Sequence, residues 1–204
     1  HITRLVRRLK KTTGLCVAII GPDGTGKSTI AKHLCSSMSD TFSKDPKVFH
    51  LRPLFFNSSQ KETSSKSITP YTSPPRNRIL SKVFMFYHTM MFSFSYWVKI
   101  HPLLLKGHLV VLDRYYLDLL ADPARFRLNI GKKVLSLGKR FVPSPHIVFL
   151  LDAPAKIIQQ RKSEVSEDLT NQQRLSYQLL KKQFPEIIVI NTDGNENSVA
   201  DSLV

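Results

Sequence analysis

The 204-residue chain carries 30 Lys and Arg against 15 Asp and Glu, a formal net charge of +15, and 42% of its residues are hydrophobic. This length and composition suit one well-buried α/β domain and exclude a disordered chain. The two cysteines, Cys16 and Cys35, are too few for a disulfide framework and indicate small buried side chains in a reducing compartment, so we expect a cytoplasmic protein. The surplus of positive charge either favours polyanionic partners or serves solubility.

Short apolar runs along the chain predict five buried strands, at 15–20, 47–51, 109–112, 147–151 and 187–190. Helical patterns lie between and after them, at 27–38, at 78–100 with Pro102 as the stop, at 154–162, at 169–183 and over the last residues. Strands that alternate with helices predict right-handed βαβ units and a five-stranded parallel sheet, the three-layer α/β/α fold of P-loop NTPases. Three strands end at Gly21, Asp113 and Asp152, and ligands bind at the carboxyl ends of such strands.

The domain organisation follows from the same pattern. We expect a basic amino-terminal segment over 1–13 and a single domain over 14–204, with a mobile excursion at about 57–75, where Ser, Thr, Lys and Pro are frequent. The longest apolar stretch, 83–98, is shorter than the ~20 residues that a membrane span needs, so no transmembrane segment is predicted.

One loop between a predicted strand and a predicted helix carries a phosphate-binding motif. The pattern G-x-x-x-x-G-K-[ST] is met by Gly21, Gly26, Lys27 and Ser28. Glycines let successive N–H groups point at phosphate oxygens, and the helix that opens at Lys27 adds its positive end. We expect Lys27 to reach the β and γ phosphates of ATP and Ser28 to ligate Mg²⁺. The residues predicted to bind ATP are Gly21, Asp23, Gly24, Thr25, Gly26, Lys27, Ser28 and Thr29.

The third predicted strand ends in an acidic residue followed by a basic one. Asp113 is a candidate Mg²⁺ ligand, often acting through water, together with Ser28. Arg114 next to it suits phosphoryl transfer, because an acceptor phosphate must be held in line with the donor. The alternative is a local ion pair at a strand end.

Four segments in family order resemble the thymidylate kinase-like branch of the nucleoside monophosphate kinases. They are Gly21-Pro22-Asp23-Gly24-Thr25-Gly26-Lys27-Ser28-Thr29, His50-Leu51-Arg52-Pro53, Asp113-Arg114-Tyr115, and Leu151-Asp152-Ala153-Pro154 leading to Arg161-Lys162. Asp113-Arg114-Tyr115-Tyr116 with the following Asp122-Pro123 is similar to a divergent bacterial subgroup of this branch. The resemblance covers nearly the whole chain.

The resemblance implies roles for individual residues. Asp23 would contact the acceptor sugar hydroxyl, Arg52 would position the acceptor or the transferring phosphoryl, and Arg114 would grip the acceptor phosphate. Some members carry an arginine where this chain has Gly24, and members with glycine there take that charge from a lid. The catalytic set is therefore Lys27, Asp113, Arg114 and Arg161, with Arg161 at the start of a lid at about 161–170 and with Lys162 and Arg174 behind it.

The match is weaker where the acceptor base would bind. Thymidylate kinases usually place an arginine in the long helix, and the segment 82–92 has none, although Arg76 and Arg78 at its start are substitutes. Tyr87 is the candidate base contact, with Phe86 and His88 as neighbours, and the alternative is that this aromatic stripe packs in the core.

Three hypotheses result. The leading one is Mg²⁺- and ATP-dependent phosphoryl transfer to a nucleoside monophosphate, with dTMP as the default, or to another small phosphorylated acceptor. A P-loop module that docks nucleic acid is a second hypothesis, not favoured. A peripheral membrane role through the basic residues at 4–11 or 132–140 is a third. A homodimer is left open.

Overall fold

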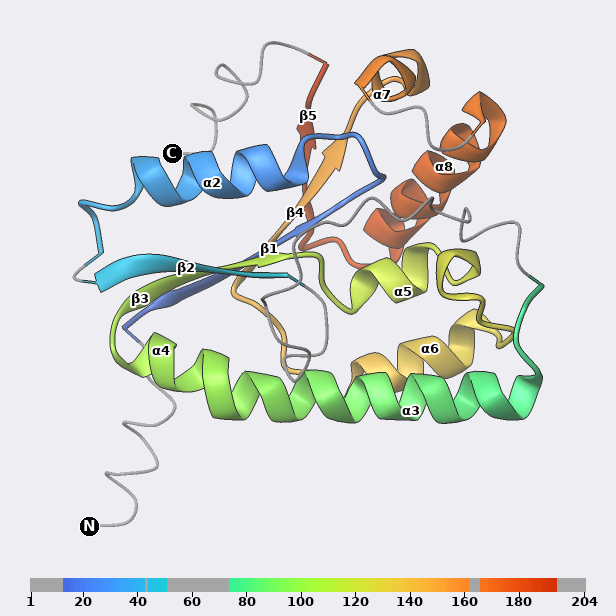
Figure 1. Cartoon of the computed structure of the whole chain (residues 1–204), viewed down its shortest axis with the longest axis horizontal. Helices are drawn as coiled ribbons and strands as arrows, with labels where there is room; N and C mark the ends of the chain where they lie inside the picture. The colour runs from blue at the N-terminus through green and yellow to red at the C-terminus, as the bar shows by residue number, and fades with distance from the viewer. Residues whose placement is uncertain (1–12, 43, 51–73, 162–165, 194–204) are drawn as a thin grey trace, which may run out of the picture.

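The central sheet has five parallel strands in the order β2-β3-β1-β4-β5 (Figure 1). It comes from a computed structural model that describes residues 13–42, 44–50, 74–161 and 166–193. The strands are β1 (Leu15–Ile20), β2 (Lys44–His50), β3 (His108–Asp113), β4 (Ile147–Asp152) and β5 (Ile188–Asn191). All five predicted strands and their parallel arrangement are therefore confirmed.

Three neighbouring strands bring the predicted functional residues to one edge of the sheet. β1 lies between β3 and β4, with Ile19 opposite both Asp113 and Phe149. These strands are almost wholly buried, as expected for apolar runs covered on both faces of a sheet. Their shared direction places Gly21, Asp113 and Asp152 at their common carboxyl edge.

Helices cover both faces of the sheet, which confirms the three-layer architecture. On one face, α2 (Lys27–Ser37) packs Ile30, Ala31 and Leu34 onto one core cluster with β1 and β3. The larger cluster lies on the other face, under the remaining helices of the core. Those helices are α3 (Arg78–Ser95), α4 (His101–Leu105), α5 (Leu117–Ala121), α6 (Lys132–Lys139) and α8 (Glu167–Gln183). The short α7 (Ala155–Arg161) packs against α8.

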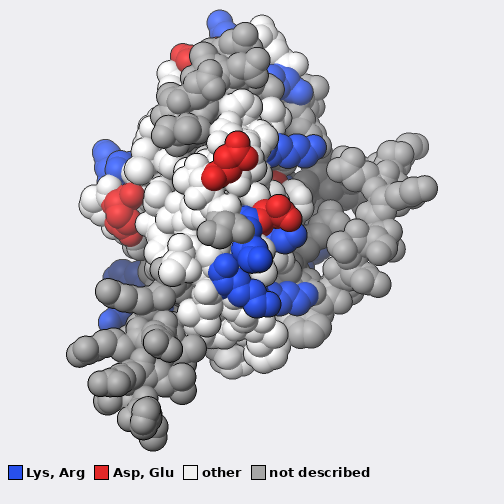
Figure 2. Space-filling model, turned by 90° about the vertical axis from the view of Figure 1, so that its left-hand side faces the viewer, with Lys and Arg blue, Asp and Glu red and all other residues white. Residues whose placement is uncertain are grey.

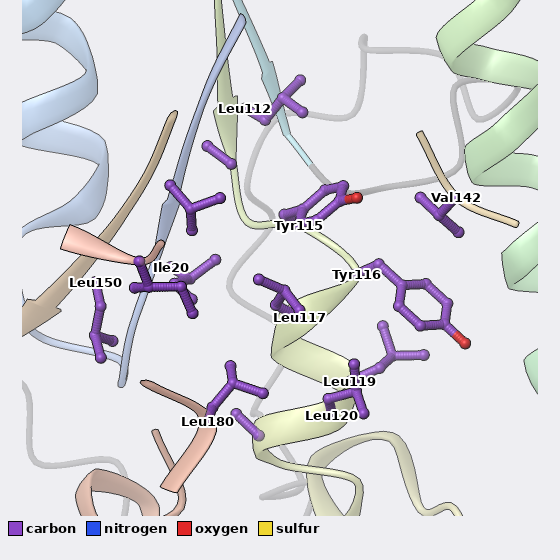
Figure 3. Packing of buried hydrophobic residues seen from close by; sticks show 14 of the residues in the cluster. Ile20, Leu112, Tyr115, Tyr116, Leu117, Leu119, Leu120, Val142, Leu150 and Leu180 are labelled. Carbon is purple, nitrogen blue, oxygen red and sulfur yellow. The ribbon is translucent and has the colours of Figure 1, made fainter. Parts of the chain in front are cut away.

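The segment after β3 forms short helices that the sequence patterns did not predict. Tyr115 and Tyr116 are fully buried, and Figure 3 shows them pointing into the core with Leu117, Leu119 and Leu120 of α5 around them. The 3₁₀ turn Ala124–Phe126 follows, and then α6. Two large buried tyrosines hold the chain to the core directly after Arg114, so they fix where that arginine lies.

The prediction that Pro102 ends the long helix is wrong. A π-helical turn, Tyr96–Ile100, follows α3, and α4 continues the helix to Leu105. Pro102 lies in the first turn of α4, directly after the π-helical turn. A π-helical turn changes the hydrogen-bond register before the proline, and the N–H of His101 is bonded to the carbonyl of Tyr96.

Several predicted segments lie outside the described residues. They include the amino-terminal segment up to 12, the last residues from 194, most of the excursion at 57–75, and 162–165 within the predicted lid. Among the residues that the structure describes, none of the helices combines the length and the apolar character needed to cross a lipid bilayer.

Positive charge also lies away from the predicted site. Figure 2 views the side of the molecule where β2 and β3 begin, and Lys and Arg gather there beside a few acidic side chains. This is the amino edge of the strands, opposite the phosphate loop. The net charge of +15 is thus spread over more than one face and does not by itself identify a ligand.

Candidate active site

The loop between β1 and α2 has the backbone shape that the glycine motif predicts. Gly21 has φ +144°, and a Cβ there would come within 2.5 Å of the carbonyl oxygen of Leu151 in β4. Gly24 and Gly26 also have positive φ, and Gly26 is the N-cap of α2. Thr25 is buried and donates to the carbonyl of Pro22 at 2.8 Å, which closes the loop across its base.

Lys27 curls back over this loop. Its Nζ donates to the carbonyl oxygen of Gly21 at 2.9 Å and also to that of Pro22, and it lies 3.6 Å from Oδ1 of Asp23. Burial and the nearby charge of Arg114 lower the pKa of Lys27 to about 8, against the opposing effect of the surrounding carboxylates. An anionic ligand would stabilise the charge of this buried ammonium group, which two carbonyl oxygens now hold, so the geometry suits a phosphate.

Ser28 and Asp113 meet across the gap between α2 and β3. The Ser28 hydroxyl donates to Oδ2 of Asp113 at 2.8 Å, and Nδ1 of His50 lies 2.9 Å from the same oxygen. A hydroxyl and a carboxylate are the protein oxygens that hold Mg²⁺ beside a phosphate loop. No group of three or more His, Cys, Asp or Glu side chains forms a metal cluster within the described ranges. By their chemistry, the Ser28 hydroxyl and the Asp113 carboxylate suit an ion that takes its other ligands from phosphates and water.

Asp23 stands at the centre of a cluster of cations. Oδ1 pairs with Nη2 of Arg114, and Oδ2 pairs with Nη1 of Arg125, a residue of the 3₁₀ turn. Burial alone would raise the pKa of Asp23, but the charges of Lys27, Arg114 and Arg125 outweigh burial and hold that pKa well below its usual range. Asp23 is consequently ionised and is shared between the donor loop and two arginines.

Arg114 is held in an unusual position by its backbone. Its φ is +80°, a conformation that costs a non-glycine residue about 1–3 kcal/mol. Its N–H bonds to the carbonyl of Ile19 at 3.0 Å, so the turn is tied to β1. Nη1 of Arg114 is buried, and no group of the described residues accepts a hydrogen bond from it, although Oδ1 of Asp118 lies 4.0 Å away. Strained backbone and an unsatisfied buried donor are features of ligand-binding sites.

Two carboxylates of the segment after β3 lie behind the arginines, and α8 contacts both. Asp118 accepts hydrogen bonds from the N–H of Tyr115 and, at 2.6 Å, from the hydroxyl of Tyr177. Asp122 accepts from the N–H of Arg125 at 3.2 Å and from the side-chain amide of Gln173 at 3.0 Å. Gln173 and Tyr177 are one turn apart on α8, and the two aspartates are four residues apart, so one helix face holds both.

The other predicted residues on the donor side occupy separate places. Arg161 is the last residue of α7 and is exposed, and the chain from 162 to 165 lies outside the described residues. Arg174 of α8 makes a two-pronged ion pair with Asp152, Nε to Oδ1 at 2.7 Å and Nη2 to Oδ2 at 3.1 Å. The role of Arg161 in transfer therefore stays a prediction, and Arg174 is joined to the strand end of β4.

The predicted acceptor contacts are only partly brought together. Arg52 lies outside the described residues. Tyr87 is 44% exposed and meets the ring of His88 edge-on. Arg76, in contrast, stacks over the Phe84 ring at 4.0 Å and donates to the carbonyl of Phe126 beside Arg125. Arg76 thus lies next to the site. A substitute for the missing helix arginine would have to lie there.

Arg125 is the site residue that sequence reasoning missed. The pattern Asp122-Pro123 drew attention to this segment, but nothing in the spacing of Arg125 relates it to the phosphate loop 102 residues earlier. The available signal was a basic residue soon after Asp113-Arg114-Tyr115, in a segment without the usual small residues. Only the fold brings that residue to Asp23.

Comparisons with known proteins concern the family and the fold of the chain. A family model described as thymidylate kinase matches residues 19–201. The fold is similar to that of thymidylate kinase from Ehrlichia chaffeensis, with a TM-score of 0.63 and 16% identity over 93% of this chain and 96% of that chain. No curated protein matches the sequence. At this identity the structural likeness shows the fold, and the family model covers most of the chain.

Proposed function

Because the chain belongs to the thymidylate kinase family, we propose that this nucleotide kinase transfers the γ-phosphoryl group of ATP to a nucleoside monophosphate, with dTMP as the first candidate. The observation that carries the proposal is the contact between Asp23 and Arg114. One side chain belongs to the donor-phosphate loop, and the other presents a buried, unsatisfied guanidinium nitrogen next to that loop. An acceptor phosphate bound there would lie beside the donor, as in-line transfer requires.

On the donor side, the backbone N–H groups of the loop and the ammonium group of Lys27 bind the β and γ phosphates. Lys27 then exchanges its two carbonyl partners for phosphate oxygens and keeps its charge in a buried site. Ser28 and Asp113 would hold Mg²⁺, which neutralises charge on the transferring phosphoryl group. No covalent enzyme intermediate is needed, because positioning and charge neutralisation supply the catalysis.

On the acceptor side, Arg114 binds the acceptor phosphate. Asp23 contacts the sugar hydroxyl once that phosphate has replaced the Asp23 carboxylate at the guanidinium group of Arg114. Arg76 stacked on Phe84 offers a flat cationic surface to the base. We assign lid closure over the donor to the segment from Arg161 to about 170, and this assignment rests on the resemblance. The acceptor contact of Arg52, which lies outside the described residues, is assigned on the same resemblance.

The experiment is a measurement of ADP release from Mg·ATP in the presence of a panel of deoxy- and ribonucleoside monophosphates. We expect one acceptor, dTMP first, to stimulate ADP release well above the rate without acceptor. Arg114→Ala should remove the stimulation, whereas the matched control Lys133→Ala, an exposed residue of α6, should retain it. Equal ADP release with and without every acceptor in the panel would overturn the proposal.

A further inference from the structure

Arg125 contacts the site from the segment after β3, and the family resemblance gave this residue no role. Its Nη1 pairs with Oδ2 of Asp23, while Arg114 pairs with Oδ1, so each oxygen of one carboxylate has its own guanidinium group. Arg125 is 26% exposed and Arg114 is 20% exposed. Both groups are therefore mostly enclosed but can be reached by a ligand.

Three cationic side chains lie around Asp23. Lys27, Arg114 and Arg125 each lie within ion-pair distance of its carboxylate, whereas Asp118 is 4.0 Å from Arg114 and Asp122 accepts from the backbone N–H of Arg125 rather than from its guanidinium group. Three cations that converge on one carboxylate in a partly buried site also favour an anion of higher charge at the same place.

The position of Arg125 is fixed by contacts that leave its guanidinium group directed at Asp23. Its N–H is capped by Asp122, which in turn accepts from Gln173 of α8. The turn that carries it is also tied to the start of α3, because the N–H of Arg76 bonds to the carbonyl of Arg127 at 2.9 Å. The turn is thus held from α8 and from the residues just before α3, which suits a preorganised binding group.

From this geometry we propose that Arg125 is a second ligand of the acceptor phosphate, and that Asp23 occupies the site between Arg114 and Arg125 until that phosphate displaces it. The inference rests on the proposed function for the identity of the anion as an acceptor phosphate. Two guanidinium groups on neighbouring oxygens match a phosphate dianion, which offers more oxygens and more charge than a carboxylate. The acceptor class is thus a phosphate monoester, and a nucleoside without its phosphate is excluded as a substrate.

The displacement also gives Asp23 two successive roles, one before the acceptor binds and one after. Without acceptor, its carboxylate neutralises the arginines and limits repulsion between them. With acceptor bound, the carboxylate is released toward the sugar. Binding of the acceptor phosphate therefore competes with an internal anion, and removal of that anion should strengthen phosphate binding.

The test uses inorganic sulfate as the probe, with the donor site of the full chain filled by Mg²⁺ and a non-hydrolysable ATP analogue. Titration calorimetry would follow sulfate binding to the wild type, Arg125→Ala, Arg125→Lys and Asp23→Asn. We expect Arg125→Ala to weaken sulfate binding about tenfold or more, the value of a charge-assisted hydrogen bond. Arg125→Lys should recover part of the loss, and Lys133→Ala should bind as the wild type does.

Asp23→Asn gives the opposite result, because it removes the competing carboxylate. Sulfate should bind this variant more tightly than the wild type, an outcome that misfolding cannot produce. In activity assays, Arg125→Ala should raise the KM for the phosphorylated acceptor about tenfold and leave the KM for ATP within about twofold of the wild type.

Sulfate affinity that is unchanged in both Arg125→Ala and Asp23→Asn would overturn the inference. The two proposals fail separately. If no nucleoside monophosphate stimulates ADP release while the sulfate pattern holds, the proposed function is wrong and the two-arginine anion site stands. If an acceptor is phosphorylated and Arg125→Ala leaves its KM unchanged, the proposed function stands and the role of Arg125 is wrong.

Discussion

Gly21→Ala is expected to damage both the stability of the fold and the donor site. Gly21 has φ +144°, and an added Cβ would lie 2.5 Å from the carbonyl oxygen of Leu151, an atom of the β4 backbone that cannot rotate away. The backbone conformation alone costs about 1–3 kcal/mol, and relief of the overlap adds to that. A total of about 3 kcal/mol corresponds to a fall in Tm of about 6–12 °C for a domain of this size.

The matched control is Gly131→Ala at the N-cap of α6. Gly131 has φ −68° and ψ 149°, and an added Cβ there meets no atom within 4 Å, so the substitution should leave Tm unchanged or raise it slightly. Thermal melting of both variants, with and without Mg·ATP, separates the cases. A Gly21→Ala protein that melts within about 2 °C of the wild type and binds ATP normally would refute this reasoning about the loop.

Three further predictions concern the charges and oxygens of the site. The pKa of Lys27 is about 8 before ATP binds, and a bound phosphate must raise that pKa, so ATP binding takes up a proton at pH 8 and above and the affinity for ATP should fall by up to about tenfold per pH unit above pH 8. Calorimetry at pH 7 and pH 9 in buffers of different ionisation enthalpy checks this prediction, and equal affinities would contradict it. Asp113→Asn should raise the Mg²⁺ concentration for half-maximal activity about tenfold or more, because the ion loses a charged oxygen next to Ser28; an unchanged Mg²⁺ titration would count against the assignment. Tyr177→Phe removes a hydrogen bond to the buried carboxylate of Asp118 and should cost about 1–3 kcal/mol in urea unfolding; no loss of stability would show that this contact is unimportant.

The strands and the phosphate loop were predictable because their signals are local. An apolar run followed by Gly21 or Asp113 predicts a buried parallel strand with a functional residue at its carboxyl end, and both strands are where the patterns put them. The glycine motif also depends only on short-range backbone geometry. The long helix was also predictable, but its end was not. The chain continues as a helix past Pro102 because a π-helical turn comes before the proline.

The acceptor side was less predictable because its contacts are long-range. Arg125 reaches Asp23 over a separation of 102 residues, and Gln173 reaches Asp122 over 51. The pairing of Gln173 with Asp122 joins α8 to the C-cap of α5, and α5 is a five-residue helix with no periodic signal of its own. Tyr87 is 44% exposed, so it does not pack in the core as the alternative interpretation held, and its contact with the acceptor base stays a prediction.

The most direct test of the central claim is identification of both products after incubation with Mg·ATP and dTMP or the stimulating acceptor found in the panel. Phosphorus NMR distinguishes a nucleoside diphosphate from inorganic phosphate in the same sample. We predict one ADP and one diphosphate of the acceptor nucleoside for each ATP consumed, and loss of both products in Arg114→Ala. ADP that appears with inorganic phosphate and without any phosphorylated acceptor would show that the chain is an ATPase and would contradict the account.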